Sequence, residues 1–209
     1  MKIGIIGAGF VGRSIAKLAL AAGHDVMLSN SRGPQTLFSL APMIGCQVGS
    51  AEDAAEFGEV VVIAVPLSAI HSLPVAGIKD KHVIDAVNYY PERDGPIEAL
   101  ESGETTTSEL LAQILPAATV TKAFNAIPMT QLESDGLPAG AENRRALPLA
   151  GDSEKGKAIA AALYEAFGFD TVDAGPLSEG WRFERGQPAY CVRMTRPTLL
   201  TTLSHTPHR

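Results

Sequence analysis

Three glycines near the start of the chain have the spacing that points most clearly to chemistry. Gly7, Gly9 and Gly12 form a G-x-G-x-x-G pattern, after an apolar run over residues 3–6 and before residues at helical spacing, Val11, Ile15, Leu18 and Ala22. At such a strand-to-helix turn the first glycine permits the tight turn, the second lets a pyrophosphate approach the backbone, and the third lets the helix pack on the strand. The N–H groups and the positive dipole end of the helix would then face the phosphates. The alternative is a glycine-rich turn that binds nothing.

The end of the second predicted strand, residues 24–29, decides which dinucleotide this kind of fold prefers. Versions that use NAD place Asp or Glu there, to accept hydrogen bonds from the ribose 2′-OH. This chain instead has Ser29, Asn30, Ser31 and Arg32. Arg32 can grip a 2′-phosphate that a carboxylate would repel, and Ser31 can donate a hydrogen bond to it. The sequence therefore favours NADP; the alternative is an ordinary surface turn with a solvated arginine.

Polar or turn-forming residues follow three further predicted strands, residues 60–65, 82–87 and 120–124. The chain leaves these strands at Pro66, Asn88 and Asn125, and in a doubly wound sheet the carboxyl ends of the strands form the ligand-binding edge. An asparagine side chain offers both a donor and an acceptor, which matches the carboxamide of nicotinamide. Either asparagine could fix the nicotinamide ring for hydride transfer. The alternative is loop capping, in which Asn is common.

The sequence contains no convincing set of nucleophile, base and orienting residue. His71 lies just beyond the strand at 60–65 and could act as a general acid, but a lone His on a short helix is more often a surface residue. Beside Asn125 no strong proton donor is evident, which favours an acceptor that takes hydride directly. The stretch Ala126-Ile127-Pro128 offers a small floor and an apolar wall for a flat ring. An enzyme is still possible, because in hydride transfer the cofactor carries the chemistry.

These residues need a scaffold of alternating strands and helices. Further strands are expected over 46–48, 146–150 and 171–172, and helices over 35–44, after Ser50, after Thr106, and from Ser153 to a stop at Gly168. Ser50 is a predicted N-cap, and Thr106 with Glu109 has the capping-box pattern. Residues 92–104 are polar and interrupted by Gly and Pro, so they are expected to be mainly loop. The pattern predicts an α/β fold with a doubly wound, mainly parallel Rossmann sheet.

The composition fits a globular protein without a polyanionic partner. A chain of 209 residues with 45% hydrophobic residues suffices for one substantial α/β domain. The net charge of −6 gives no support to a nucleic acid or a membrane surface as partner, and no apolar run reaches the length of a membrane span. Cys46 and Cys191 lie far apart without metal-ligand spacing, so we expect reduced thiols, no metal and a cytoplasmic protein. Because Met1 and Lys2 lead directly into the glycine turn, no signal peptide is expected.

Several stretches of the sequence carry a resemblance to a known family. They are Gly7-Ala8-Gly9-Phe10-Val11-Gly12, Ser29-Asn30-Ser31-Arg32, Ala64-Val65-Pro66, Lys122-Ala123-Phe124-Asn125-Ala126-Ile127 and Asp173-Ala174-Gly175-Pro176-Leu177. The chain resembles the NADPH-dependent reductases of the deazaflavin coenzyme F-420 (F420), also called coenzyme F420-dependent NADP oxidoreductases. The resemblance covers roughly residues 1–177. Its first part is shared with other dinucleotide enzymes such as pyrroline-carboxylate reductases, and the last two stretches are more specific.

The resemblance implies a Rossmann domain that binds NADP(H), over residues 1–177, and a small C-terminal lobe that helps to hold the deazaflavin against the nicotinamide. Together with the motifs above, it predicts a cofactor site composed of Gly7, Gly9, Phe10, Val11, Gly12, Ser29, Asn30, Ser31, Arg32, Ala64, Val65, Pro66, Asn88, Asn125 and Ala126. No catalytic residue is assigned. The expected function is hydride transfer between NADP(H) and a planar acceptor, and the resemblance favours the deazaflavin F420. The alternatives are an NADPH-dependent reductase of another acceptor (a flavin, a ferric chelate or an imine) and a non-catalytic NADPH-binding sensor with a closed acceptor crevice.

The last section of the chain, residues 178–209, is expected to form a C-terminal arm. Its segment 178–190 departs from the family pattern, and Leu199, Leu200 and Leu203 suggest a short closing helix. The stretch from Trp181 to Tyr190 is rich in aromatic residues and arginine, which are enriched in protein interfaces. It predicts a homodimer that uses this arm; the alternative is an arm folded back on its own domain.

Overall fold

The strands of this protein form one continuous sheet. The structure, a computed structural model, describes residues 1–207, and within them the sheet has eight strands in the order β3-β2-β1-β4-β5-β6-β7-β8. All neighbouring strands are parallel except β6 and β7. The first six strands have the order 3-2-1-4-5-6 of a dinucleotide-binding fold. The predicted α/β fold with a doubly wound, mainly parallel sheet is confirmed.

The strands are short, as expected of a buried parallel sheet. Their bounds are β1 (Lys2–Ile6), β2 (Asp25–Ser29), β3 (Gln47–Gly49), β4 (Val60–Ile63), β5 (His82–Asp85), β6 (Thr119–Lys122), β7 (Ala146–Gly151) and β8 (Asp170–Asp173). Strands β4 and β5 end two residues earlier than the sequence predicted. Just after the two strands, the N–H of Ala64 still donates to the Ile6 carbonyl and the N–H of Ala86 to the Ile63 carbonyl. Beyond these residues the chain leaves the sheet toward its carboxyl edge.

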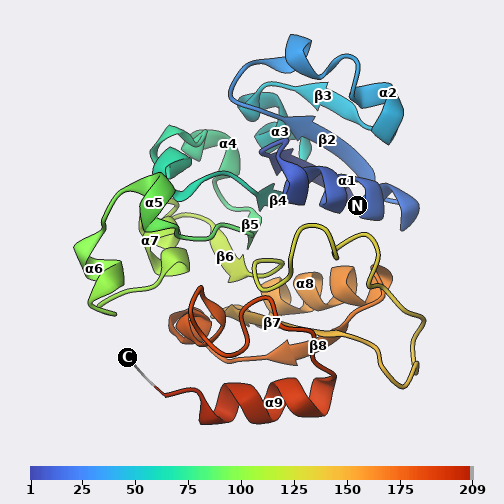
Figure 1. Cartoon of the computed structure of the whole chain (residues 1–209). Helices are drawn as coiled ribbons and strands as arrows, with labels where there is room; N and C mark the ends of the chain where they lie inside the picture. The colour runs from blue at the N-terminus through green and yellow to red at the C-terminus, as the bar shows by residue number, and fades with distance from the viewer. Residues whose placement is uncertain (208–209) are drawn as a thin grey trace.

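Helices cover both faces of the sheet (Figure 1). The α-helices are α1 (Phe10–Ala21), α2 (Ala41–Ile44), α3 (Ala51–Phe57), α4 (Val75–Ile78), α5 (Pro91–Asp94), α6 (Glu98–Glu101), α7 (Thr107–Ile114), α8 (Glu154–Ala166) and α9 (Arg196–His205). Three 3-10 segments join them, η1 (Pro34–Leu37), η2 (Leu67–Ser72) and η3 (Leu177–Phe183). The helix predicted over 35–44 is divided into η1 and α2, and the loop predicted over 92–104 contains the short helices α5 and α6.

Local sequence signals set the ends of several helices. Ser50 and Asp53 form a complete capping box at α3, and Thr106 with Glu109 forms another at α7. The hydroxyl of Ser153 accepts a hydrogen bond from Gly156 N–H at the start of α8. These three helix starts lie where the sequence predicted them, because each depends on residues within four positions of one another.

The core has one layer on each face of the sheet. Along β4, Val60 and Val62 join the layer that also contains residues of α1 and α8, and Val61 and Ile63 join the layer that contains residues of α3 and α7. This alternation is the period of two that a strand imposes. All four residues of β4 are buried, so the strand is central, as its uninterrupted apolar sequence indicated.

The C-terminal segment packs on the sheet of its own chain. Phe183 from η3, and Leu199 and Leu203 from α9, share a buried cluster with residues of β7 and β8. Helix α9 lies along the outer side of β7 and β8, and α8 lies on their other side (Figure 1). The proposed boundary at residue 177 therefore separates two segments that share one core. A homodimer through the arm stays a prediction.

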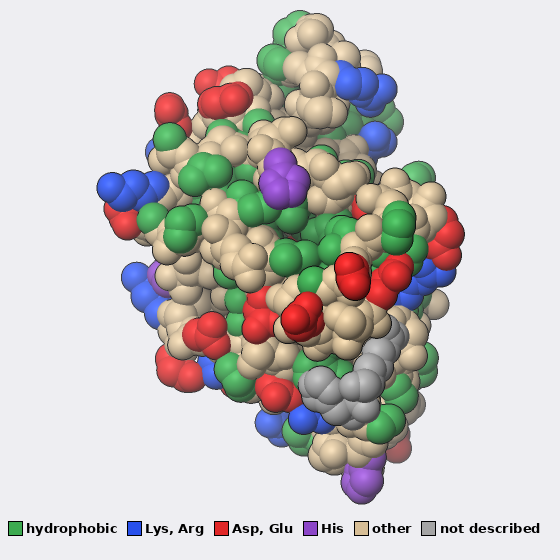
Figure 2. All heavy atoms as spheres, turned by 90° about the vertical axis from the view of Figure 1, so that its left-hand side faces the viewer, with side chains coloured by type: hydrophobic (Ala, Val, Ile, Leu, Met, Phe, Trp, Pro, Cys, Tyr) green, Lys and Arg blue, Asp and Glu red, His purple; other side chains and the backbone are tan. Residues whose placement is uncertain are grey.

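The surface over the helices that follow β4 and β5 mixes charges of both signs with apolar side chains (Figure 2). On this face acidic side chains gather over the middle and lower part, basic ones lie scattered around them, and no continuous basic surface is seen. Among residues 1–207, no helix has the length and apolar character needed to cross a bilayer.

Candidate functional site

The glycine turn joins β1 to α1 at the carboxyl edge of the sheet. Gly7 has a φ of +117° and donates its N–H to the Ser29 carbonyl at 3.0 Å. A Cβ atom on Gly7 would lie 2.3 Å from the Ala64 carbonyl oxygen, and one on Gly12 would lie 1.9 Å from the Gly7 carbonyl oxygen. The fold itself therefore requires glycine at both positions.

Gly9 is different, because the fold does not require it. Its φ of −73° suits any residue, and a Cβ atom added there would have nothing within 4 Å. No side chain caps α1, and its first turn holds no acidic residue. The first N–H groups of the helix thus lack side-chain acceptors, as a phosphate-binding helix start does. The space beside Gly9 fits a pyrophosphate held against the backbone.

A cleft of about 500 Å³, open to solvent at its mouth, begins at this turn. We call it the edge cleft. It runs along the carboxyl ends of β1, β4 and β5 and reaches the loop after β6 and the C-terminal segment. Its lining comprises Gly9, Phe10, Val11, Ala64, Val65, Pro66, Ala86, Asn88, Tyr90, Arg93, Phe124, Ile127, Pro128, Met129, Thr130, Tyr190 and Cys191. Seven of the predicted site residues thus line one continuous cavity: Gly9, Phe10, Val11, Ala64, Val65, Pro66 and Asn88.

The residues predicted to bind the ribose lie at the end of β2, where some are exposed and others support the turn or the sheet. Ser31 and Arg32 are exposed, and no hydrogen bond or ion pair holds the Arg32 guanidinium within residues 1–207. Asn30 organises the turn, since its Oδ1 accepts from Arg32 N–H at 3.1 Å and its Nδ2 donates to Thr36. The structure corrects the prediction that Ser29 belongs to the cofactor site. Its side chain is fully buried and donates to the Ile5 carbonyl, so it holds the sheet together and does not face a ribose.

The two asparagines predicted to face the nicotinamide lie together. Asn88 Nδ2 donates to the Asn125 carbonyl at 3.1 Å, and Asn125 Nδ2 donates to the carbonyls of Asp85 and Val87. These donated hydrogen bonds fix the orientation of both side-chain amides. Each amide leaves a buried Oδ1 atom without a partner among the described residues. Buried acceptors are normally satisfied. Asn88 lines the edge cleft, so its buried Oδ1 is a candidate acceptor for an N–H donor of a ligand that reaches it.

Ala126 does not have the place that the sequence predicted. Its side chain packs in the buried cluster of the C-terminal segment and is absent from the lining of the edge cleft. The reason is the backbone before it: Phe124 has a φ of +66°, and its N–H donates to the Tyr164 hydroxyl at 2.8 Å. This left-handed residue turns the chain away from the extended path. Phe124 lines the cleft in its place, beside Ile127 and Pro128, which form an apolar wall as the sequence predicted.

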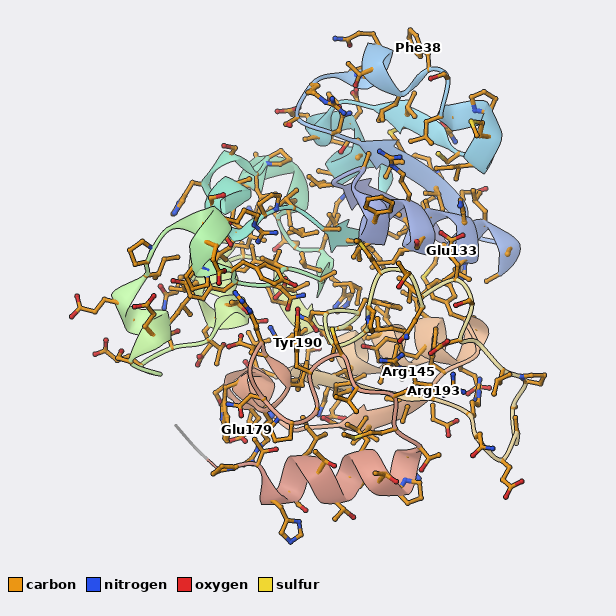
Figure 3. All side chains as sticks on the ribbon, in the orientation of Figure 1. Phe38, Glu133, Arg145, Glu179, Tyr190 and Arg193 are labelled. Carbon is orange, nitrogen blue, oxygen red and sulfur yellow. The ribbon has the colours of Figure 1, made fainter. Side chains whose placement is uncertain are left out.

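Sequence reasoning missed the far end of the cleft, where two tyrosines meet. The hydroxyl oxygens of Tyr90 and Tyr190 lie 2.5 Å apart, and both residues line the cleft. Tyr190 extends from the C-terminal segment toward the helices that follow β5 (Figure 3). Tyr90 could have been found, because it lies two residues after Asn88 at a strand end. Tyr190 could not, since no local pattern shows that residue 190 returns to this edge. His71 is exposed and lies outside the lining.

A buried ionic cluster ties the C-terminal segment to β6 and α7. The ammonium group of Lys122 is fully buried and contacts Glu184 Oε1 at 3.2 Å and Thr107 Oγ1 at 2.8 Å. Asp85, also fully buried, accepts from Val87 N–H and from the Ser108 hydroxyl. Burial raises the pKa of Asp85, and the nearby Lys122 charge opposes that rise. Burial would also raise the pKa of Glu184, but Lys122 and the Thr107 donors outweigh it and lower that pKa.

Comparison with known proteins places these features in context. Residues 2–89 match the family described as NADP oxidoreductase coenzyme F420-dependent. The rat metalloreductase STEAP3 is 31% identical over 208 residues, which cover 95% of this chain and 39% of the longer protein. The chain thus spans about two fifths of the length of this curated relative.

Two solved structures are similar along nearly the whole chain. The hypothetical protein SMa0349 from Sinorhizobium meliloti is 30% identical with a TM-score of 0.80, covering 94% of this chain and 95% of that one. An F420-dependent NADP reductase, so described, from Arthrobacter sp. FB24 is 23% identical with a TM-score of 0.73, covering 86% of this chain and 87% of that one. The second likeness supports the fold alone.

Proposed function

We propose that this chain, of which residues 2–89 match the family of coenzyme F420-dependent NADP oxidoreductases, exchanges hydride between NADP(H) and a planar acceptor, the deazaflavin coenzyme F420. The observation that carries the proposal is the edge cleft, which joins the open turn at Gly9 to the partnerless Oδ1 of Asn88. An elongated ligand with a phosphate group near one end and an amide donor near the other matches this arrangement.

The residues at the start of the cleft would hold the dinucleotide. The N–H groups at the start of α1 would donate to the pyrophosphate beside Gly9, and the Arg32 guanidinium would pair with a 2′-phosphate. Asn88 would accept a hydrogen bond from the carboxamide of the nicotinamide through Oδ1. Arg93 holds the carbonyl of Asn88 at 2.7 Å and thereby fixes that loop. When bound, the dinucleotide would supply the hydride.

The remaining space of the edge cleft would hold the acceptor. Its wall is apolar at Phe124, Ile127 and Pro128, which suits a flat conjugated ring laid against the nicotinamide. A hydride donor and acceptor react when the two carbons lie about 3–3.5 Å apart. The open cleft also argues against the alternative of a non-catalytic sensor with a closed acceptor crevice. The family matched by residues 2–89 favours the deazaflavin among planar acceptors.

A second candidate is the reduction of a ferric chelate. It is favoured by the rat metalloreductase STEAP3, whose likeness extends over 95% of this chain. Because the chain spans only 39% of that protein, a chelate acceptor stays the second proposal. A cytoplasmic location and a homodimer are also proposed, on the sequence grounds given above.

An acceptor screen tests both candidates. NADPH oxidation is followed by absorbance with deazaflavin F420, flavins, quinones, ferric chelates and cyclic imines, each at several concentrations. Stopped-flow mixing of protein, NADPH and oxidised deazaflavin should show deazaflavin reduction that saturates with cofactor. If the deazaflavin stays oxidised at saturating NADPH while a ferric chelate is reduced rapidly, the second candidate replaces the first.

A further inference from the structure

The two tyrosines at the far end of the edge cleft form a hydrogen-bonded phenol pair. Tyr90 follows β5, and Tyr190 comes from the C-terminal segment, 100 residues later in the chain. A pair of phenols has two O–H hydrogens and needs only one for the bond between them. The other is available to a molecule in the cleft.

Either phenol oxygen can be the donor in this bond. Burial raises the pKa of Tyr190, and its hydrogen bond with Tyr90 acts in the same direction, which fits Tyr190 as the donor. When Tyr190 donates, the O–H hydrogen of Tyr90 is left for a molecule in the cleft. Tyr90 is also two residues from Asn88, which lies on the same cleft lining.

Charged groups from two elements surround the ring of Tyr90. The guanidinium carbons of Arg93 and Arg185 lie 4.8 Å and 5.1 Å from its centroid. Each of these arginines also pairs with a carboxylate, Arg93 with Asp94 and Arg185 with Glu92. The Cys191 thiol follows Tyr190 on the cleft lining, and burial raises its pKa, so it carries no charge beside the pair. A negative charge that develops on the Tyr90 oxygen would thus accept a hydrogen bond from the Tyr190 hydroxyl. The two guanidinium groups beside the ring would also favour it, to an extent that their paired carboxylates reduce.

We infer that Tyr90 is the proton donor of the acceptor half-reaction and that Tyr190 positions it and stabilises its phenolate. The inference rests on the proposed function, because it needs NADPH as the source of hydride. It also changes one conclusion from the sequence, which found no strong proton donor near Asn125.

The proposed step balances in atoms and electrons. A carbon of the acceptor gains the hydride that NADPH loses, so the acceptor is reduced by two electrons and NADPH becomes NADP⁺. The O–H bond of Tyr90 breaks, its electron pair stays on the phenol oxygen, and the proton forms a new N–H or O–H bond on the acceptor. Solvent at the open mouth of the cleft then returns a proton to the phenolate.

This chemistry restricts the acceptor class. The acceptor should be a conjugated ring whose reduction takes hydride at carbon and a proton at a ring nitrogen or oxygen. A deazaflavin meets this description, because it takes hydride at a ring carbon and a proton at a ring nitrogen. A flavin takes hydride at nitrogen, and a quinone reduced to a hydroquinone gains only O–H bonds. A ferric chelate does not meet the description either, because its reduction adds only electrons at the metal. The inferred role of Tyr90 therefore favours the first proposed function over the second.

The test compares Tyr90→Phe and Tyr190→Phe with Tyr89→Phe as a matched control. The Tyr89 hydroxyl contacts Gly95, Ile97 and Glu101, and its side chain is outside the lining of the edge cleft. Three quantities are measured with the full chain: NADPH affinity, affinity for oxidised deazaflavin in the presence of NADP⁺, and the solvent deuterium isotope effect on single-turnover deazaflavin reduction.

For Tyr90→Phe we expect NADPH affinity within about twofold of wild type and hydride transfer at least about 100-fold slower, the lower range for loss of a general acid. The solvent isotope effect should disappear, and deazaflavin affinity should fall several-fold. Tyr190→Phe should slow the step about tenfold and keep the isotope effect, because Tyr90 still donates. Tyr89→Phe should change none of these quantities.

Two results separate the failure of this inference from the failure of the proposed function. If wild type reduces the deazaflavin and Tyr90→Phe keeps both its rate and its isotope effect, the tyrosine pair only anchors the C-terminal segment, and the inference is wrong. If wild type binds NADPH but neither binds nor reduces any planar acceptor of the screen, the proposed function fails and the inference fails with it.

Discussion

Replacing Gly9 by valine should remove dinucleotide binding without unfolding the protein. The structure separates this glycine from its two neighbours in the motif, since a Cβ atom at Gly9 meets nothing within 4 Å. The φ of −73° and ψ of −174° at Gly9 are in the extended region that valine prefers. The substitution therefore adds atoms only to the space that a pyrophosphate would use.

The expected magnitudes follow from these contacts. Valine is a poorer N-cap than glycine, which costs about 1 kcal/mol of unfolding free energy, or roughly 2–4 °C in Tm for a chain of this size. The loss of NADPH affinity should be at least about 100-fold, or about 2.8 kcal/mol. For Gly12→Ala we expect the main effect on stability instead of on binding, because its Cβ would lie 1.9 Å from the Gly7 carbonyl oxygen. Such an overlap costs about 3 kcal/mol or more, so Tm should fall by roughly 6–12 °C.

The assay pairs thermal unfolding with NADPH titration by calorimetry for wild type, Gly9→Val and Gly12→Ala. The reasoning predicts a folded Gly9→Val variant that shows no heat of binding at cofactor concentrations that saturate wild type. A Gly9→Val variant with wild-type Tm and wild-type affinity would refute it, and the glycine turn would then lie outside the binding site.

Three further predictions concern cofactor choice, acid stability and assembly. Arg32→Ala should weaken NADPH binding about tenfold to a hundredfold, because a lost charge-assisted contact is worth about 1.5–3 kcal/mol, and it should leave NADH binding unchanged. If calorimetry shows equal losses of affinity for both cofactors, Arg32 does not bind the 2′-phosphate. Burial would raise the pKa of Asp94, but hydrogen bonds from Arg93 and from the Tyr90 and Ser68 N–H groups outweigh it and lower the pKa to about 2, from 3.8. Because this pKa is lower in the folded than in the unfolded state, the ionised carboxylate stabilises the fold above about pH 4, and this stabilisation is lost as the pH falls toward 2. Between about pH 5 and pH 2.5 the Tm of Asp94→Asn should therefore fall less than the Tm of wild type. Equal falls in Tm would contradict this role of Asp94. Light scattering of the full chain should show a dimer. Leu200→Asp should weaken this dimer, because Leu200 is an apolar residue of the arm with 45% of its surface exposed. If wild type is a monomer at micromolar concentration, the dimer prediction is wrong and the arm packs only on its own domain.

The sequence by itself determined the features that depend on near neighbours in the chain. The turn at Gly7, the capping boxes at Ser50 and Thr106, and the buried strand β4 were all predicted from residues within a few positions of one another. The physical reason is that a positive φ, a capped helix start and a two-residue alternation are each fixed by local geometry. The same locality explains why the start of the edge cleft, at Gly9, could be identified before the fold was known.

The tertiary structure decided the far end of the cleft. Tyr190 meets Tyr90 across 100 residues of sequence, and Glu184 reaches Lys122 across 62. Such contacts depend on how the C-terminal segment packs on β7 and β8, which no local pattern encodes. Ala126 shows the same limit at short range, because the left-handed conformation of Phe124 turns its side chain from the predicted cleft floor into the core. Local rules predict the proposed dinucleotide end of the cleft, and the path of the chain in space places the groups that would meet the acceptor.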